Sequence, residues 1–307
     1  MALWIDTDMG FDDLAAVLVL THHQTKIDGM SLVAGNSPLE TVRRNAAAAR
    51  DVFGWDFPIY TGCEQTIMGG LETAQAILGP RGMQSSGAHL PDCDPLAENR
   101  AFDALCDWLK SPSSDVKHIL ALGPLGNIAT LVLARPDLAA RIDQITWMGG
   151  AFGRGNHTPF AEYNAFADPE ALAVVLSRNI AIRMVELDLC RQVTTNPDDV
   201  APIRMAGGKN AGLLADLTEG YINIAITRGR LAMSIFDPLA AVAVVAPDIV
   251  RFANAKITVD TDHGETRGRT IITPDDQSNA AHQYGIEVDI EPARNLVLDA
   301  LKAEAAK

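Results

Sequence analysis

The 307-residue sequence is poor in positive charge, and this deficit limits its partners. It contains 25 Lys and Arg against 39 Asp and Glu, which gives a formal net charge of −14 at pH 7. A chain this acidic is repelled by the phosphates of nucleic acids and by anionic membranes. We therefore expect neither a nucleic-acid polymer nor a membrane as a partner, whereas the charge is compatible with small neutral substrates.

Cysteines and long hydrophobic runs are also scarce. The longest apolar run, Pro238 to Pro247, is too short to span a bilayer. Asp6 and Asp8 interrupt the apolar start that a signal peptide would need. The cysteines are scattered without the spacing of metal ligands, which suits reduced thiols in the cytosol. We therefore expect a cytoplasmic protein. The chain has four cysteines: Cys63, Cys93, Cys106 and Cys190.

The sequence does contain the material for a large core. Hydrophobic residues make up 48% of it and charged residues only 21%, which is typical of a globular chain. Neither a linker nor an internal repeat divides it, and 307 residues is an ordinary length for one α/β domain. We expect a single domain over residues 1–307.

Short apolar runs alternate with helical patterns along most of the chain. This alternation predicts an α/β fold with an open, mostly parallel, twisted sheet and helices on both faces. Near the C-terminus, Lys256–Asp260 and Thr270–Thr273 flank a turn region and predict a β-hairpin at a sheet edge. The loops 61–94 and 149–168 are long, and long loops are usually functional. The predicted parallel strands are Leu3–Ile5, Ser31–Ala34, Pro58–Tyr60, His118–Leu122, Ile145–Met148 and Ile180–Val185.

Four carboxylates gather where the first predicted strand meets the first predicted helix. Asp6, Asp8, Asp12 and Asp13 fall within eight positions, and Gly10 is predicted to let the backbone turn tightly between them. Capping of the helix can use one or two carboxylates, but not four. Like charges this close are costly unless a cation lies between them. The motif therefore predicts a hard divalent cation such as Ca²⁺ or Mg²⁺, which prefers oxygen ligands.

Two other kinds of acidic site fit the motif less well. An EF-hand is excluded because the glycine is misplaced and no glutamate closes a twelve-residue loop. A phosphatase of the haloacid dehalogenase type also begins with a strand that ends in Asp-x-Asp. It has Thr or Val where this chain has Gly10, however, and has no use for the pair Asp12 and Asp13.

Polar residues and glycines also follow other predicted strands. The carboxyl ends of parallel strands meet at one edge of a sheet, and ligands bind in the crevice there. We expect four segments to converge on this crevice: Asp6–Asp8, Gly35–Asn36, Leu122–Asn127 and Met148–Gly150.

In these segments the chain resembles the inosine-uridine-preferring nucleoside hydrolases, which are Ca²⁺-dependent N-ribohydrolases. The run Asp6-Thr-Asp-Met-Gly-Phe-Asp-Asp13 matches the signature Asp-x-Asp-x-Gly-x-Asp-Asp of that family, and the resemblance covers essentially the whole length. It implies the Rossmann-like fold of the family. The supporting segments are Val33–Asn36, Leu122–Asn127, Met148–Gly150, Ala161–Asn164 with Ala167–Glu170, and Asp237–Ala240.

The resemblance implies roles for individual residues. Asp8 would be the general base, taking a proton from metal-activated water that attacks the anomeric carbon through an oxocarbenium-like transition state. Asp6 would be structural, holding the loop through backbone N–H groups. The Ca²⁺ ligands would be Asp8, Asp13, the backbone carbonyl of Leu122, and Asp237. The ribose would be bound by Asp12, Asn36, Met148, Glu162, Asn164 and Asp237.

Two departures from the family concern the departing base. Many members carry a histidine where this chain has Phe236, and a second histidine where it has Leu78. A histidine is the natural acid for protonating a leaving base. Phe236 and Leu78 are therefore candidate contacts to the base, and the base preference stays open.

Other basic residues give alternatives for this end of the site. His118 and His157 are expected at the surface or at helix ends, and His89, in the first long loop, is a minor candidate for approaching the base. Arg228 and Arg230 end a long predicted helix. They either interact with the negative end of that helix or contact a base carbonyl.

The leading hypothesis is a Ca²⁺-dependent ribonucleoside hydrolase of nucleoside salvage, active as a homodimer or homotetramer. One alternative is a nucleoside- or ribose-binding protein on the same scaffold, which the loss of both histidines would favour. A metal-dependent phosphohydrolase is the other alternative, and it would need a basic residue in the site to bind phosphate.

Overall fold

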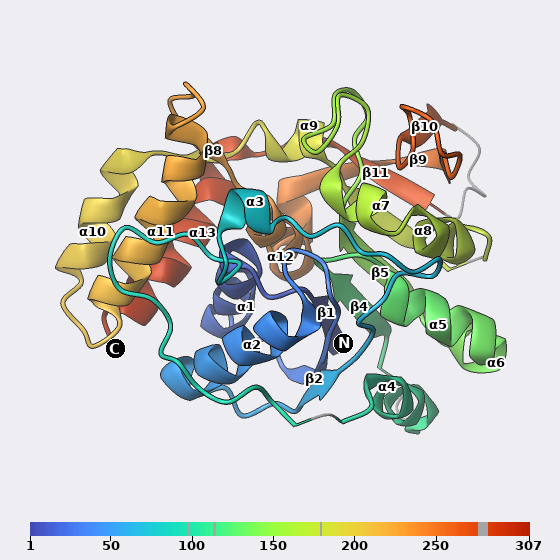
Figure 1. Ribbon diagram of the computed structural model, residues 1–307, viewed down its shortest axis with the longest axis horizontal. Helices are drawn as coiled ribbons and strands as arrows, with labels where there is room; N and C mark the ends of the chain where they lie inside the picture. The colour runs from blue at the N-terminus through green and yellow to red at the C-terminus, as the bar shows by residue number, and fades with distance from the viewer. Residues whose placement is uncertain (98, 113–114, 179, 276–281) are drawn as a thin grey trace.

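The centre of the computed structural model is a nine-stranded sheet (Figure 1). The structure describes residues 1–97, 99–112, 115–178, 180–275 and 282–307. The strand order is β10-β9-β11-β6-β5-β4-β1-β2-β3, and all neighbours from β11 to β3 are parallel. The predicted fold class is thereby confirmed. The parallel strands are β1 (Ala2–Thr7), β2 (Ile27–Leu32), β3 (Ile59–Thr61), β4 (Lys117–Ala121), β5 (Gln144–Met148), β6 (Ile182–Val185) and β11 (His282–Val288).

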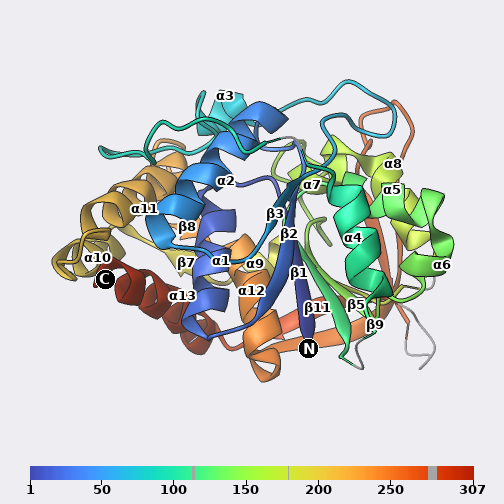
Figure 2. The same ribbon diagram turned by 90° about the horizontal axis from the view of Figure 1, so that it is seen from below.

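Helices cover both faces of the sheet, as the view from below shows (Figure 2). Alternate residues of β1 serve the two sides: Leu3 and Ile5 belong to one apolar cluster, and Ala2 and Trp4 to the other. The first cluster includes residues of α1 (Phe11–His22), α2 (Leu39–Phe53), α11 (Ala211–Ile226), α12 (Asp237–Val245) and α13 (Ile290–Ala305). The second includes residues of α4 (Ala101–Lys110), α5 (Gly126–Ala134), α6 (Pro136–Ala139) and α8 (Pro169–Leu176).

The predicted hairpin is present at the edge of the sheet. Strands β9 (Val250–Val259) and β10 (Thr270–Pro274) pair antiparallel, and β10 is the edge strand. The sequence analysis did not predict β11, which fills the place between β9 and β6. Its sequence, His-Gln-Tyr-Gly-Ile-Glu-Val, is polar and contains a glycine, so it lacks the apolar run by which the other strands were found.

The order β3-β2-β1-β4-β5-β6 places the reversal of strand order between β1 and β4. Parallel sheets bind their ligands outside the carboxyl ends of the strands at such a reversal. The long segment between β3 and α4 crosses this edge and carries the short helix α3 (Gln75–Leu78) (Figure 1). The remaining elements of this part of the chain are short. They are the helices α7 (Tyr163–Ala167), α9 (Leu187–Cys190) and α10 (Val200–Met205) and the strands β7 (Thr194–Thr195) and β8 (Met233–Ser234). Among the described helices, none combines the length and apolarity needed to cross a membrane.

Candidate active site

Two backbone features of the loop between β1 and α1 bring its carboxylates close together. Met9 adopts a left-handed conformation with φ 44°, which is uncommon for a residue with a side chain. Gly10, in contrast, has extended backbone, so the predicted reason for this glycine was wrong. A Cβ at Gly10 would lie 2.9 Å from Asn36 Nδ2 and 3.1 Å from a carboxylate oxygen of Asp13. Glycine is therefore required by space.

Asp13 fixes the start of α1 from inside the loop. Its carboxylate accepts hydrogen bonds from the Thr7 hydroxyl and from the backbone N–H of Gly10, the latter at 2.7 Å. Thr7 in turn accepts a hydrogen bond from the N–H of Met9 at 3.1 Å. The Asp13 side chain is fully buried, and its orientation is set by these bonds.

Asp8 is held by Asn36, which follows β2. The backbone N–H and the side-chain amide of Asn36 donate to the two carboxylate oxygens at 2.6 and 2.9 Å. A Cβ at Gly35 would lie 2.1 Å from Asp8 Oδ2, and one at Gly123 would lie 3.2 Å from Asp8 Cγ. These two glycines, from different strand ends, therefore make the space that the Asp8 carboxylate occupies.

Asp237 at the start of α12 joins this group from the helix that packs beside α1 on the same face of the sheet. Asp12, Asp13 and Asp237 each offer a carboxylate oxygen within 4.8 Å of the others. Burial raises the pKa of these three carboxyl groups and of Asp8. The neighbouring negative charges raise the pKa of Asp8, Asp12 and Asp237 further, and the pKa of Asp12 reaches about 7. Buried oxygens in such mutual repulsion are the donor set that a hard divalent cation satisfies. The residues present therefore fit a Ca²⁺-type ion.

Asp6 lies below the site and is part of the framework. It accepts hydrogen bonds from the Ser31 hydroxyl and from the Asn127 amide, the latter at 2.7 Å, and burial raises its pKa to about 6. The prediction that backbone N–H groups bind this carboxylate was wrong, because side chains from β2 and α5 do so. These bonds tie β1 to its neighbours beneath the acidic loop.

A pocket opens above the acidic group, and its lining contains all but two of the predicted site residues. Asp8 and Asp13 lie beneath it rather than in its wall. The predicted residues that line it are Asp12, Asn36, Leu78, Leu122, Met148, Glu162, Asn164, Phe236 and Asp237. Lining residues that the sequence analysis did not assign to the site are Ala74, Ile77, Asn156, His157, Tyr163, Tyr221, Ile224 and Met233, together with Arg228 and Arg230, which it left open.

One end of the pocket is polar and firmly hydrogen bonded. The Glu162 carboxylate caps α7, accepting from the N–H groups of Asn164 and Ala165, and also from Gly150 at 2.8 Å. The Asn164 amide donates to the carbonyls of Leu122 and Met148, both at 3.0 Å. Its oxygen is left for a ligand. Burial raises the pKa of Glu162 to about 7.

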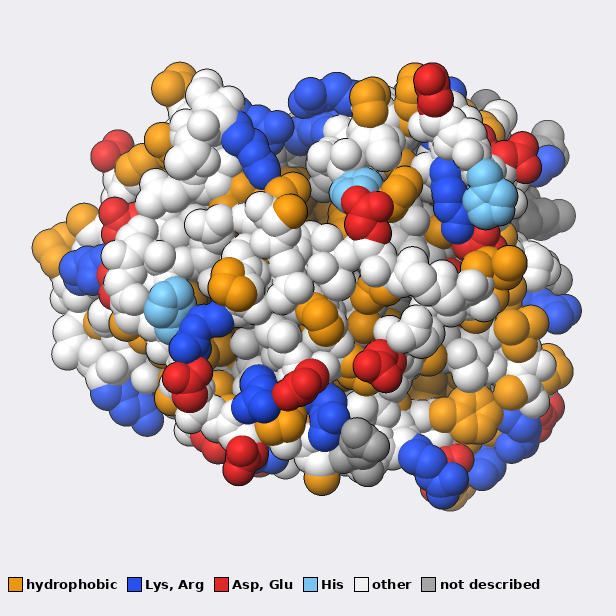
Figure 3. All heavy atoms as spheres, in the orientation of Figure 1, with side chains coloured by type: hydrophobic (Ala, Val, Ile, Leu, Met, Phe, Trp, Pro, Cys, Tyr) orange, Lys and Arg blue, Asp and Glu red, His pale blue; other side chains and the backbone are white. Residues whose placement is uncertain are grey.

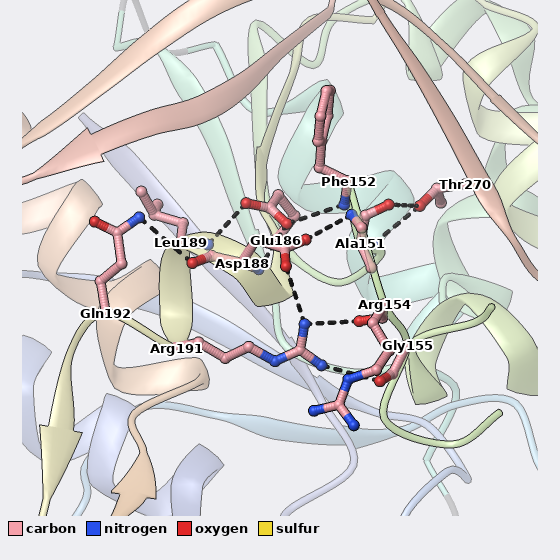
Figure 4. Close-up of polar contacts among 11 residues, drawn as sticks. Ala151, Phe152, Arg154, Gly155, Glu186, Asp188, Leu189, Arg191, Gln192 and Thr270 are labelled. Carbon is pink, nitrogen blue, oxygen red and sulfur yellow. Dashed lines mark hydrogen bonds and ion pairs between the residues drawn. The ribbon is translucent and has the colours of Figure 1, made fainter. Parts of the chain in front are cut away.

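The loop after β5 carries two of the residues that sequence reasoning missed, Asn156 and His157. Glu186 and Asp188 accept from the N–H groups of Phe152 and Gly153, and Arg191 donates to the carbonyls just before Asn156 (Figure 4). His157 lies 3.3 Å from the Glu72 carboxylate, and its side chain is only 17% exposed. The presence of a histidine in the second long loop was the one signal in the sequence that could have indicated His157 as a site residue. The spacing of residues could not show that this loop folds back to the pocket.

The other end of the pocket is apolar. Ile77 and Leu78 of α3 line it together with Ile224 of α11, Met233 of β8 and Phe236. His89, the minor candidate for approaching the base, is not among the lining residues, because its segment packs against α11 through the Ala88 N–H and Asp216. His118, predicted at the surface, is buried in β4 and hydrogen bonds to Thr146.

Comparison with known proteins finds similarity over nearly the whole chain. A family model described as inosine-uridine preferring nucleoside hydrolase matches residues 3–296. The pyrimidine-specific ribonucleoside hydrolase RihB of Escherichia coli is 32% identical over 274 residues, which are 87% of this chain and 85% of that protein. A purine-preferring ribonucleoside hydrolase from Gardnerella vaginalis superposes with a TM-score of 0.90 at 27% identity, covering 100% and 99% of the two chains. A plant nucleoside hydrolase, PpNRh1, gives 0.88 at 26% identity, covering 98% and 99%.

Proposed function

The chain belongs to the inosine-uridine preferring nucleoside hydrolase family and is a ribonucleoside N-ribohydrolase, and we propose that the pocket above Asp8 performs its reaction. The enzyme hydrolyses the N-glycosidic bond and releases free base and ribose. One observation carries the assignment of the site. A single pocket joins a buried carboxylate group, a polar wall and an apolar wall, which are the three surfaces that a reacting water, a sugar and a planar base require.

The polar side chains bind and orient the ribose. Asp12, Asn36, Glu162, Asn164 and Asp237 line the pocket. Asn36, Glu162 and Asn164 are held by their own hydrogen bonds, so these three need little reorganisation on binding. Met148 packs against the sugar. A substrate that lacks a hydroxyl would leave a buried carboxylate without its partner, which is the basis of selectivity for ribose.

Asp8 is the general base. Asn36 holds both of its oxygens, so the carboxylate faces one direction, and burial keeps its pKa above the ordinary range. It takes a proton from the water that attacks the anomeric carbon. Positive charge then develops on the sugar ring, and the surrounding carboxylates stabilise it.

The carboxylates of Asp8, Asp13 and Asp237 and the carbonyl of Leu122 would hold a hard divalent cation, because every donor is an oxygen. We propose that the ion is Ca²⁺, as the resemblance to the family implies. When bound, the ion lowers the pKa of water and orients the ribose hydroxyls. Asp12 lies in the same close group of carboxylates and also lines the pocket, so its carboxylate would be available to a ribose hydroxyl next to the ion.

The activity is tested by offering the purified protein nucleosides, nucleotides and sugar phosphates with Ca²⁺ present, and measuring free base, ribose and phosphate separately. We expect base and ribose in equal amounts from ribonucleosides and no phosphate from any substrate. Phosphate release would favour the phosphohydrolase, and tight nucleoside binding without turnover would favour the binding protein. Either result would contradict the proposal.

A further inference from the structure

The apolar end of the pocket carries positive charge at its outer border. Arg228 and Arg230 line the pocket together with Ile224, Met233 and Phe236, whereas the lining carboxylates Asp12, Glu162 and Asp237 belong to its floor and to the sugar-binding wall. In Figure 3, basic side chains lie beside the hollowed region near the end of α11 and β8. An apolar end that is bordered by two arginines differs from the surroundings that a neutral base alone would need.

The turn after α11 fixes where the two arginines start. The N–H groups of Arg228 and Arg230 both donate to the carbonyl of Ala225, at 3.0 and 3.1 Å. Gly229 between them is left-handed, with φ 75°, and a Cβ there would meet nothing within 4 Å. The glycine is therefore needed for the backbone conformation, and that conformation brings both side chains to the border of the pocket.

Several arginines of this acidic chain are neutralised by carboxylates. Arg204, Arg191 and Arg294 each form an ion pair with a carboxylate, at 2.7, 3.0 and 2.5 Å. Within the described ranges, neither Arg228 nor Arg230 has a side-chain hydrogen bond or an ion pair. The alternative partner is the negative end of α11, and one positive side chain is enough to interact favourably with a helix end. Two exposed and uncompensated guanidinium groups next to the apolar end of the pocket are available to a ligand.

We propose that Arg228 and Arg230 form a subsite for a leaving base that carries a negative charge, such as a carboxylate or an ionised ring imide, on the edge away from the sugar. The proposal rests on the proposed function. A guanidinium group carries a permanent positive charge and binds planar anionic groups through paired hydrogen bonds. The subsite therefore selects by charge and does not donate a proton.

The bond changes are those of hydrolysis. The water oxygen forms a bond to the anomeric carbon, and the water proton passes to Asp8. The carbon–nitrogen bond breaks, and its electron pair goes to the ring nitrogen of the base. A neutral nucleoside thus releases an anionic base, which the arginines stabilise until solvent protonates it. A pyridinium riboside with a ring carboxylate releases the carboxylate form directly, with no proton required.

The test compares nicotinic acid riboside with nicotinamide riboside. Both leaving groups are pyridines with one substituent at the same ring position, which is a carboxylate in the acid and a carboxamide in the amide. We expect kcat/KM for the acid to exceed that for the amide by at least about tenfold, the size of one hydrogen bond to a charged group. In the double variant with Arg228→Met and Arg230→Met the ratio should fall to about one, and rising salt should lower it in the unaltered enzyme.

Arg178→Met is the matched control, because Arg178 is also an exposed arginine just after a helix and does not line the pocket. It should leave the ratio unchanged, and thermal unfolding should show that all variants fold. Equal or faster cleavage of the amide by the unaltered enzyme would overturn the subsite, as would a ratio that depends on His157→Gln and not on the arginines. Failure to release ribose from all of the substrates, namely both ribosides, inosine and uridine, would instead overturn the proposed function.

Discussion

The floor of the pocket and its apolar end differ in burial and in bonding. On the floor, Asp8, Asp13 and Asp237 are at most 3% exposed, and Asp8 and Asp13 accept hydrogen bonds from a defined partner. At the apolar end, Leu78 and Phe236 are only partly buried, and Arg228 and Arg230 are exposed. A substitution on the floor removes several hydrogen bonds at once, whereas a residue at the apolar end can be substituted without disturbing its neighbours. The reaction therefore depends on the floor, and the choice of base on the apolar end.

The largest effect is expected from removing the metal. Chelation should abolish activity and lower the unfolding temperature, because the carboxylates of Asp12, Asp13 and Asp237 then repel one another in a buried space. Ca²⁺ should restore both, and other divalent ions should be compared with it. The measurement is ribose release and thermal unfolding of a verified metal-free preparation. Full activity of that preparation would show that the reaction does not depend on a metal bound at the pocket floor.

Asp8→Asn should have the next largest effect. It keeps the shape and one oxygen but loses the base, so we expect kcat to fall by about 10²–10⁴ while the fold is kept. Steady-state kinetics with inosine and uridine, and a metal-binding titration, measure this. A loss of less than tenfold with the metal still bound would assign the base to another residue. Leu78→Ala is a suitable comparison, since a change at the apolar end should alter the preference among bases more than kcat.

Selectivity for the sugar should follow the floor. A 2′-deoxyribonucleoside leaves the Asp12 carboxylate without a hydroxyl partner, so we expect kcat/KM for deoxyuridine to be about 10²–10³ below that for uridine. Asp12→Ala should lower activity on uridine and reduce this ratio. Comparable values for the two substrates in the unaltered enzyme would contradict the assignment of Asp12 to the ribose.

The apolar end should respond to changes in the leaving group. With Phe236 in place of a histidine, a base that needs protonation should leave slowly, so p-nitrophenyl riboside should be cleaved much faster than inosine. Phe236→His should raise activity on inosine by up to ~10²-fold, as a general acid can, and Phe236→Leu is its control. High kcat on inosine in the unaltered enzyme, with little gain from the activated substrate, would show that an acid is already present.

The smallest expected effect is the pH dependence of the metal-free fold. Burial raises the pKa of Asp12 and Glu162 to about 7, well above their ordinary values, so the folded chain binds more protons than the unfolded chain up to that pH. Metal-free protein should therefore lose stability as the pH rises from 6.5 to 8, by a few degrees in unfolding temperature. His118, whose pKa burial lowers to about 4, acts in the opposite direction, but only below about pH 6.5. Saturating Ca²⁺ should abolish or reverse this loss of stability with rising pH. An unfolding temperature of the metal-free protein that does not change with pH would contradict the raised pKa of Asp12 and Glu162.

Much of the fold and of the floor could be predicted because the signals are local. The alternation of apolar runs and helical patterns gave the parallel sheet, and the hairpin from Lys256 to Thr273 was found at the predicted edge. Strand β11 was missed, since Gly285 and its polar neighbours give no apolar run. The reason for Gly10 was also wrong, because a steric conflict with Asn36, 26 positions later in the chain, has no local signal.

The sequence by itself determined the chemistry of the floor. Four carboxylates within eight positions predicted a cation from their spacing alone, and Asp8, Asp12 and Asp13 lie at the pocket floor, whereas Asp6 is bonded by Ser31 and Asn127. Only the tertiary structure decided what faces the base. The loop with His157 folds back over the sheet, the segment with His89 packs elsewhere, and the turn around Gly229 places two arginines at the pocket. Long loops and helix ends have no periodicity that fixes their direction, so their positions follow from packing against distant parts of the chain.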